Sequence, residues 1–191
     1  DSLYAIYQKR AAFYKNQFDS SIGFMRPRMS DGSFKKEFDV LSTHGQGFIE
    51  GNAWNYSLYV PQDPKSLMEL MGGEKPFSAQ LQKIFDIKQF DMANEPDIAY
   101  PYLFNYIKGE EWKSQEMVKK LVGEYFKNEP KGLPGNDDTG TMSAWLVYSM
   151  MGIYPISPGD PIYTITTPMF HRVTIKLDPK YYKKESIVIE R

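Results

Sequence analysis

Carboxylate and amide side chains cluster in three segments of this 191-residue chain, each beside glycine, proline or an aromatic residue. The segments are EGNAWNY (50–56), NEPD (94–97) and NDD (136–138). The sequence has no cysteine and only two histidines, and it contains no phosphate-binding loop or serine nucleophile elbow. Any catalysis by this chain would therefore depend on carboxylates.

Asn136, Asp137 and Asp138 lie on a turn rich in glycine and proline, directly before a helical pattern. That pattern is a set of residues at i, i+3, i+4 and i+7: Met142, Trp145, Leu146 and Ser149. Asp and Asn are preferred at helix N-termini, so these side chains could simply cap the helix. One acid is enough for a cap, however, and two adjacent carboxylates on a fixed turn also suit catalysis. The residues alone leave both interpretations open.

Carboxylates with aromatic neighbours are typical of glycoside hydrolysis. In that reaction one carboxylic acid protonates the leaving oxygen, and a carboxylate acts as base or nucleophile. Glu50 precedes Trp54 by four residues, and a neighbouring indole would raise the pKa of Glu50 by desolvation. The alternative for Glu50 is a solvated loop acid. For Glu95 it is an acid in the first turn of a helix that Asn94 caps.

The composition excludes several classes of partner. The chain has 23 basic and 24 acidic residues and a net charge of −1, which gives no electrostatic footprint for nucleic acid or an anionic membrane. No apolar run is long enough for membrane insertion. Aromatic residues reach 15% of the chain, which suits a carbohydrate cleft or a protein interface.

The sequence pattern predicts a mainly α fold. Helices are expected at Ser2–Phe18, 52–60, Pro64–Gly72, Phe77–Phe85, Ser114–Phe126 and Met142–Met151, with an irregular stretch from Asp19 to about Gly47. After Gly152 the pattern alternates and is rich in Ile, Thr, Tyr and Val, which predicts short strands. We therefore expect a helical part at 1–152 and a β-rich segment at 153–191 packed on it. Both ends are typical of the interior of a longer protein.

In these segments the chain resembles glycoside hydrolase family 92, the calcium-dependent exo-α-mannosidases. The resemblance is carried, in order, by FMRPR (24–28) with DGSF (31–34), EGNAWNYSLYVPQD (50–63), NEPDIAYPYLFNY (94–106), GLPGNDDTGTMSAW (132–145) and MGIYPISPGDPIYTITTPMF (151–170). It implies the later part of an (α/α)6 barrel, and a separate N-terminal β-sandwich domain, absent here, on which this part packs. The family's site lies between the two, so we expect the isolated 191 residues to hydrolyse nothing. The resemblance also implies export of the full-length protein.

The resemblance further implies roles for the carboxylates. Family members invert the configuration of the sugar, which needs a carboxylic acid and a carboxylate about 6.5–9.5 Å apart. Glu50 falls at the position of the general acid, and Asp138 at that of the general base. Asn136 or Asp137 would support the base.

The expected ligands are a mannose-containing glycan and Ca²⁺, which in the family contacts O2 and O3 of the sugar. Trp54, Asn94 and Glu95 are candidates for substrate binding. Asn94 and Glu95 are also candidate calcium ligands, because a hard cation prefers oxygen.

The sequence departs from the family pattern at three positions. Asn136 stands where many relatives have the first Asp of Asp-x-Asp, Asn94 stands where some have His, and Gln62 stands where His is frequent. The change at Asn94 puts a preference for α-1,2 linkages in doubt.

Two other functions compete with a true mannosidase. One is hydrolysis of mannose-1-phosphate diesters, which some relatives catalyse without a general acid. The other is carbohydrate binding without turnover. Retention of Glu50 and Asp138 favours the mannosidase.

Overall fold

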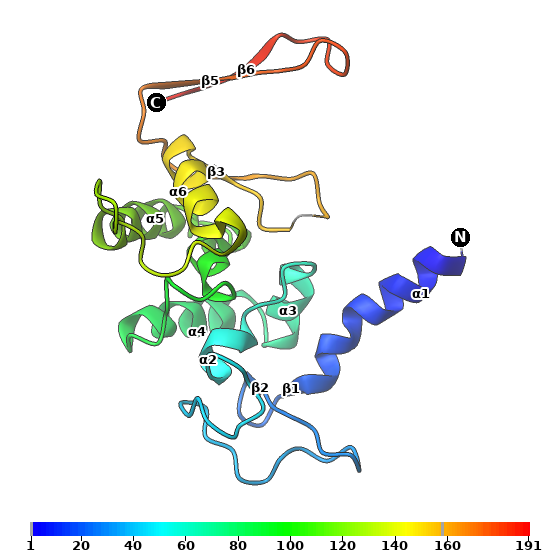
Figure 1. Ribbon diagram of the computed structural model, residues 1–191. Coiled ribbons are helices and arrows are strands. Elements are labelled where there is room, and N and C mark those ends of the chain that lie inside the picture. The colour runs from blue at the N-terminus through cyan, green and yellow to red at the C-terminus, as the bar shows by residue number, and fades with distance from the viewer. Residues whose placement is uncertain (1, 158) are drawn as a thin grey trace.

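This computed structural model describes residues 2–157 and 159–191, and its centre is a stack of helices (Figure 1). The stack contains α4 (Glu74–Asp86), α5 (Glu111–Tyr125) and α6 (Thr141–Met151). A 3-10 helix, η2 (Asp97–Tyr106), lies against both α4 and α5, and α3 (Pro64–Leu70) packs beside α4. The mainly α fold predicted from the sequence is confirmed.

The helices form where apolar residues recur with helical spacing. In α4, Phe77, Leu81 and Ile84 lie on one face and are fully buried. Each such side chain contributes about 1.5–3 kcal/mol by leaving water. The helix begins at Glu74, three residues before the predicted start, because Gly73 adopts a φ of 100° and ends the preceding turn.

The segment η2 is the most deeply buried part of the chain. Its first eight residues, Asp97–Phe104, are all buried, so it shows no alternation that would predict a helix. Pro101 lies inside it and supplies no N–H to a backbone ladder. Tyr102 stacks on Tyr154 with ring centroids 4.1 Å apart, and its hydroxyl lies 2.5 Å from Ser149 Oγ.

The N-terminal helix is shorter than the predicted Ser2–Phe18. The α-helix α1 ends at Ala11, the 3-10 helix η1 covers Ala12–Gln17, and Phe18 belongs to strand β1 (Phe18–Asp19). α1 extends away from the helical stack (Figure 1), and none of its residues is buried. The buried residue Phe18 thus lies outside the helix.

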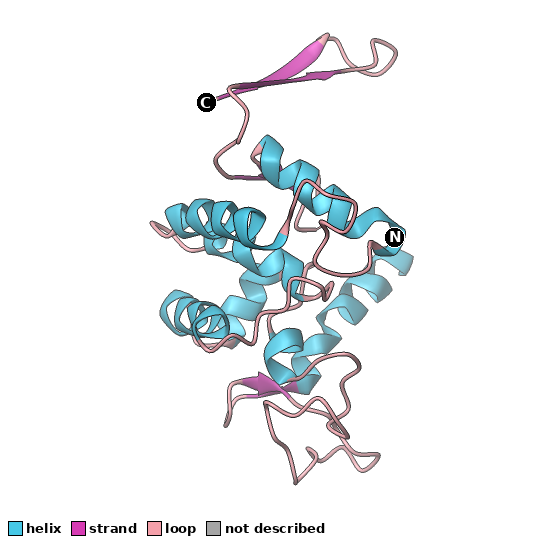
Figure 2. Cartoon of the chain, turned by 60° about the vertical axis from the view of Figure 1, so that its left-hand side comes forward, coloured by secondary structure: helices cyan, strands magenta, loops and turns pink. Residues whose placement is uncertain are grey.

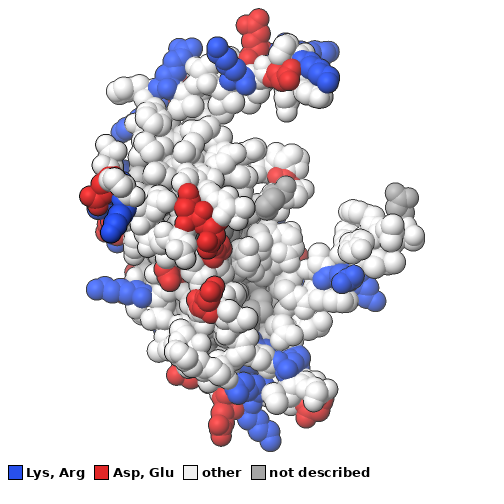
Figure 3. Space-filling model, in the orientation of Figure 1, with Lys and Arg blue, Asp and Glu red and all other residues white. Residues whose placement is uncertain are grey.

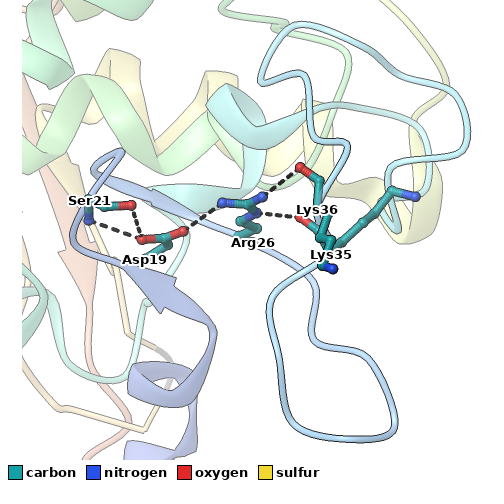
Figure 4. Close-up of polar contacts among 5 residues, drawn as sticks. All are labelled: Asp19, Ser21, Arg26, Lys35 and Lys36. Atoms are coloured by element: carbon teal, nitrogen blue, oxygen red, sulfur yellow. Dashed lines mark hydrogen bonds and ion pairs between the residues drawn. The ribbon is translucent and has the colours of Figure 1, made fainter.

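An arginine anchors the irregular stretch that follows. β1 pairs with β2 (Phe24–Met25), and Arg26 directly after β2 forms an ion pair of 2.9 Å with the buried carboxylate of Asp19 (Figure 4). The same guanidinium donates to the carbonyl oxygens of Lys35 at 2.7 Å and Lys36 at 2.9 Å. These bonds hold the loop against the β1–β2 hairpin, because the planar guanidinium group of Arg26 has five N–H donors in a fixed arrangement.

The expected strands after Gly152 are present as two-stranded antiparallel pairs. β3 (Ile153–Tyr154) pairs with β4 (Thr164–Ile165), and β5 (Arg172–Lys176) pairs with β6 (Ser186–Glu190). β3 packs on the core through Tyr154, whereas the β5–β6 hairpin stands apart from the helices in both views (Figures 1 and 2). The division at residue 152 stays a prediction. Within the described residues no helix has the length and apolarity to cross a bilayer.

A pair of glycine substitutions tests the loop between α5 and the acidic turn. A Cβ at Gly132 would lie 1.9 Å from the carbonyl oxygen of Lys127, whereas a Cβ at Gly123 in α5 meets nothing within 4 Å. We expect Gly132→Ala to destabilise the protein by about 1–3 kcal/mol. Gly123→Ala should be neutral or stabilising by up to about 1 kcal/mol, because alanine favours a helix. Thermal unfolding of both variants measures the difference, and equal melting temperatures would contradict the loop geometry.

Candidate active site

Two side-chain hydrogen bonds join the first two carboxylate segments, and one of them reaches the backbone of Glu50. The buried amide of Asn94 donates from Nδ2 to the backbone carbonyl oxygen of Glu50 at 2.6 Å. Glu50 has a φ of 58°, a left-handed conformation that is strained for a residue with a Cβ. Asn94 therefore binds the carbonyl group of the residue whose backbone is strained. The side chain of Glu50 is exposed.

The third segment lies against the second. A Cβ at Gly135 would lie 2.7 Å from the Cβ of Ala93, so only glycine allows this approach of the two loops. Ala93 directly precedes Asn94, and Gly135 directly precedes Asn136. The structure thus brings together three segments that are far apart in the sequence.

The two acids of the third segment have different roles. Asp137 accepts hydrogen bonds from the backbone N–H of Ser143 at 2.9 Å and from its hydroxyl at 2.5 Å, so it caps the first turn of α6. These bonds lower the pKa of Asp137. The side chains of Asp138 and Asn136 are exposed and form no hydrogen bond with any described residue. Asp137 thus satisfies Ser143 in the first turn of α6, whereas the side chain of Asp138 has no hydrogen-bond partner among the described residues.

Trp54 lies in the hydrophobic core. It is 6% exposed, and Phe24 packs edge-on against it with ring centroids 4.8 Å apart. The role of Trp54 beside Glu50 stays a prediction. Trp54 lies in α2 (Ala53–Ser57), and this helix directs its side chain into the core. The helix is shorter than the predicted 52–60.

Tyr56 is the aromatic residue near the carboxylates of Glu50, Glu95 and Asp97, and it was not predicted as a site residue from the sequence. Burial raises the pKa of Tyr56, and the charges of Glu50, Asp97 and Glu95 raise it further. Its hydroxyl donates to the carbonyl oxygen of Ile49, directly before Glu50. Its place in the EGNAWNY segment was the available signal.

A buried polar pair, Asn55 and Asp97, lies beneath these loops and was also missed. Asn55 donates from Nδ2 to Asp97 Oδ2 at 2.8 Å. Burial raises the pKa of Asp97 to about 7. An acid at the start of a continuous apolar run, as in PDIAYPYLF, was the sequence signal for a buried carboxyl.

One face of the molecule carries a group of acidic side chains, and a cavity lies beside α2 and the loop before it. Figure 3 shows a group of acidic side chains near the middle of one face, with both basic and acidic side chains at its upper and lower ends. A cavity of about 430 Å³ adjoins the Glu50 loop. Its lining includes Phe48 from that loop and Tyr56 from α2, together with Tyr59, Arg26 and Arg28.

The candidate calcium ligands do not form a complete metal site by themselves. Calcium takes six to eight oxygen ligands, but Asn94 and Glu95 supply one amide oxygen and one carboxylate. No group of three or more acidic or histidine side chains suited to a metal occurs within the described residues. A calcium site here would need further oxygen donors.

Comparisons with known proteins place the chain in a sequence family. Residues 1–191 match the family model described as the glycosyl hydrolase family 92 catalytic domain. An uncharacterized secreted glycosidase from the fungus Arthroderma benhamiae is 29% identical over 177 residues, which cover 87% of this chain and 23% of the relative.

Two solved structures from Bacteroides thetaiotaomicron are similar in fold. One is a family 92 α-mannosidase in complex with mannoimidazole, with a TM-score of 0.84, 32% identity, and coverage of 91% of this chain and 26% of that one. The other is a family 92 inverting mannosidase, with a TM-score of 0.84, 30% identity, and coverage of 97% and 28%. The chain thus spans about a quarter of the length of these relatives.

The different roles of the two acids in the acidic turn are testable without an activity assay. Asp137→Ala should lower the melting temperature, because it removes the acceptor for the N–H and hydroxyl of Ser143. Asp138→Ala should leave the melting temperature unchanged, because the side chain has no partner among the described residues. The same thermal unfolding measured on both variants compares them, and a larger loss with Asp138→Ala would reverse the assignment.

Proposed function

This chain belongs to glycoside hydrolase family 92, and we propose that it is part of a mannosidase that removes terminal α-linked mannose from glycans with inversion. The family match covers residues 1–191. The similar solved proteins are described as an α-mannosidase and an inverting mannosidase. Because the chain spans about a quarter of those proteins, the activity proposed is that of the full-length enzyme.

Glu50 is proposed as the general acid and Asp138 as the general base. The observation that supports this assignment is that both of their loops contact the segment 93–94, through the hydrogen bond from Asn94 to Glu50 and the close approach of Gly135 to Ala93. Asp137 is occupied by Ser143, which leaves Asp138 as the acid free to activate water. Asn136 is the neighbour available to support it.

Substrate and calcium are proposed to bind beside Asn94 and Glu95. Asn94 uses its Nδ2 on Glu50, so its oxygen remains the group that can face a ligand. The remaining calcium ligands would come from outside this chain. We propose that this region is the later part of an (α/α)6 barrel packed on an N-terminal β-sandwich domain. The isolated 191 residues would then be inactive.

Export of the full-length protein is proposed from the name of one relative. That relative, from Arthroderma benhamiae, is described as a secreted glycosidase.

Mannose release by the full-length enzyme tests the proposed activity. The substrates are α-1,2-, α-1,3-, α-1,4- and α-1,6-mannobiosides, each with calcium and with a chelator. We expect release from at least one linkage, and loss of release when calcium is removed. Release that survives chelation would contradict calcium dependence. No release from any of the four would favour phosphodiester hydrolysis or binding without turnover.

Substitution of the two carboxylates tests their roles. With mannobiosides, Glu50→Gln should lower kcat by on the order of 10²–10⁴, because the leaving alkoxide needs a proton. With α-mannosyl fluoride, whose leaving group needs none, the same variant should keep most of its activity. Asp138→Asn should lose both activities, since water still needs a base. Equal losses of Glu50→Gln on both substrates would contradict the general-acid role, and an active Asp138→Asn would contradict the base.

A further inference from the structure

We propose that Asn55 and Asp97 are positioning residues that hold the backbone at Glu50 and thereby aim its carboxyl group. The inference rests on the proposed role of Glu50 as general acid. Neither side chain needs to touch substrate, because both are buried, Asn55 at 5% and Asp97 at 0% exposure.

Asn55 binds the backbone two residues after Glu50. Its Oδ1 accepts a hydrogen bond of 2.9 Å from the N–H of Asn52. In return, Asn52 Oδ1 accepts from the N–H of Trp54 at 2.9 Å, which completes a reciprocal cap at the start of α2. The chain therefore leaves the Glu50 turn in one fixed direction.

Asp97 determines which way the Asn55 amide faces. Asn55 Nδ2 donates to Asp97 Oδ2 and to the carbonyl oxygen of Gln89, each at 2.8 Å. An amide nitrogen has two hydrogens and both are used here, so the oxygen must face the N–H of Asn52. Loss of Asp97 would remove one of the two acceptors that enforce this orientation.

The same carboxylate oxygen also fixes the loop that carries Asn94. Asp97 Oδ2 accepts from the N–H of Asp91 at 2.7 Å, and Asn94 in turn binds the carbonyl oxygen of Glu50. Two sets of hydrogen bonds therefore fix the backbone around Glu50, one through Asn55 and one through Asn94. Asp97 binds Asn55 directly and fixes the loop that carries Asn94.

The left-handed backbone conformation of Glu50 makes these hydrogen bonds necessary. A non-glycine residue with positive φ persists only where surrounding contacts enforce it. Gly51 adds to the constraint, because a Cβ there would lie 3.0 Å from Asn55 Oδ1 and from the ring of Tyr56. Release of Asn55 would free this turn to relax, and the carboxyl of Glu50 would move with it.

Asn55→Ala and Asp97→Ala in the full-length enzyme test the proposal. With the mannobioside that the wild type cleaves, kcat should fall by about 10–100-fold, since small displacements of a catalytic group cost rates of this order. With α-mannosyl fluoride, kcat should stay within about threefold, because proton donation is not needed. Asn105→Ala is the control: it removes a hydrogen bond from an asparagine to the carbonyl oxygen of Tyr102, remote from Glu50 in the hydrogen-bond network. It should change neither rate.

A second measurement does not depend on activity. Hydrogen exchange of the Asn52 amide should be faster in both variants and unchanged in the control. If a variant lost kcat equally on both substrates, the role of the residue would be structural and the proposal would be overturned. A variant that fails to fold would give the same result. Unchanged exchange at Asn52 in Asp97→Ala would also overturn it. A wild type inactive on both substrates would instead overturn the proposed function, while the exchange data would still decide whether Asp97 holds the turn.

Discussion

Burial of the first eight residues of the 3-10 helix η2 is the constraint on which this structure depends. Asp97–Phe104 are buried, so most of their polar groups need partners within the protein. Two of those partners lie on the helices that follow the candidate carboxylates in the chain. Tyr100 donates to the carbonyl oxygen of Asn55 in α2. On the other side, the indole N–H of Trp145 in α6 donates to the carbonyl oxygen of Ile98 at 2.8 Å. Satisfying η2 therefore places α2 and α6 relative to each other.

Backbone strain lies where the chemistry is proposed. The described residues contain three non-glycine positions with positive φ, which are Glu50, Lys88 and Thr139. Lys88 follows the end of α4, but Glu50 is the proposed acid and Thr139 directly follows Asp138. Each such position costs on the order of 1–3 kcal/mol and must be enforced by its surroundings. Both carboxylate turns are thus held in shape by packing from elsewhere in the fold.

Much of this arrangement could be predicted from the sequence, but not its details. Helical spacing located α4 and α6, because each buries one stripe of its surface. η2 was not predicted as a helix, because a segment buried on all sides shows no period. Trp54 was placed beside Glu50 because the two are neighbours in sequence, whereas its packing in the core depends on the cap at Asn52, which only the structure shows. Likewise, only the backbone conformation after Asp137 shows which acid of the turn caps α6.

The groups that hold the site and the groups proposed to react are different residues. Asn52, Asn55, Asn94 and Asp97 are buried and bonded, whereas Glu50, Asn136 and Asp138 are exposed. A buried polar group left without a partner costs about 1–3 kcal/mol, so substitution in the first set also costs stability. The exposed set carries no such penalty. Asn136, which replaces the Asp expected from the family pattern, belongs to that set and makes no side-chain hydrogen bond with the described residues. The fold thus permits a change of chemistry at the acidic turn while the loops that present it stay fixed.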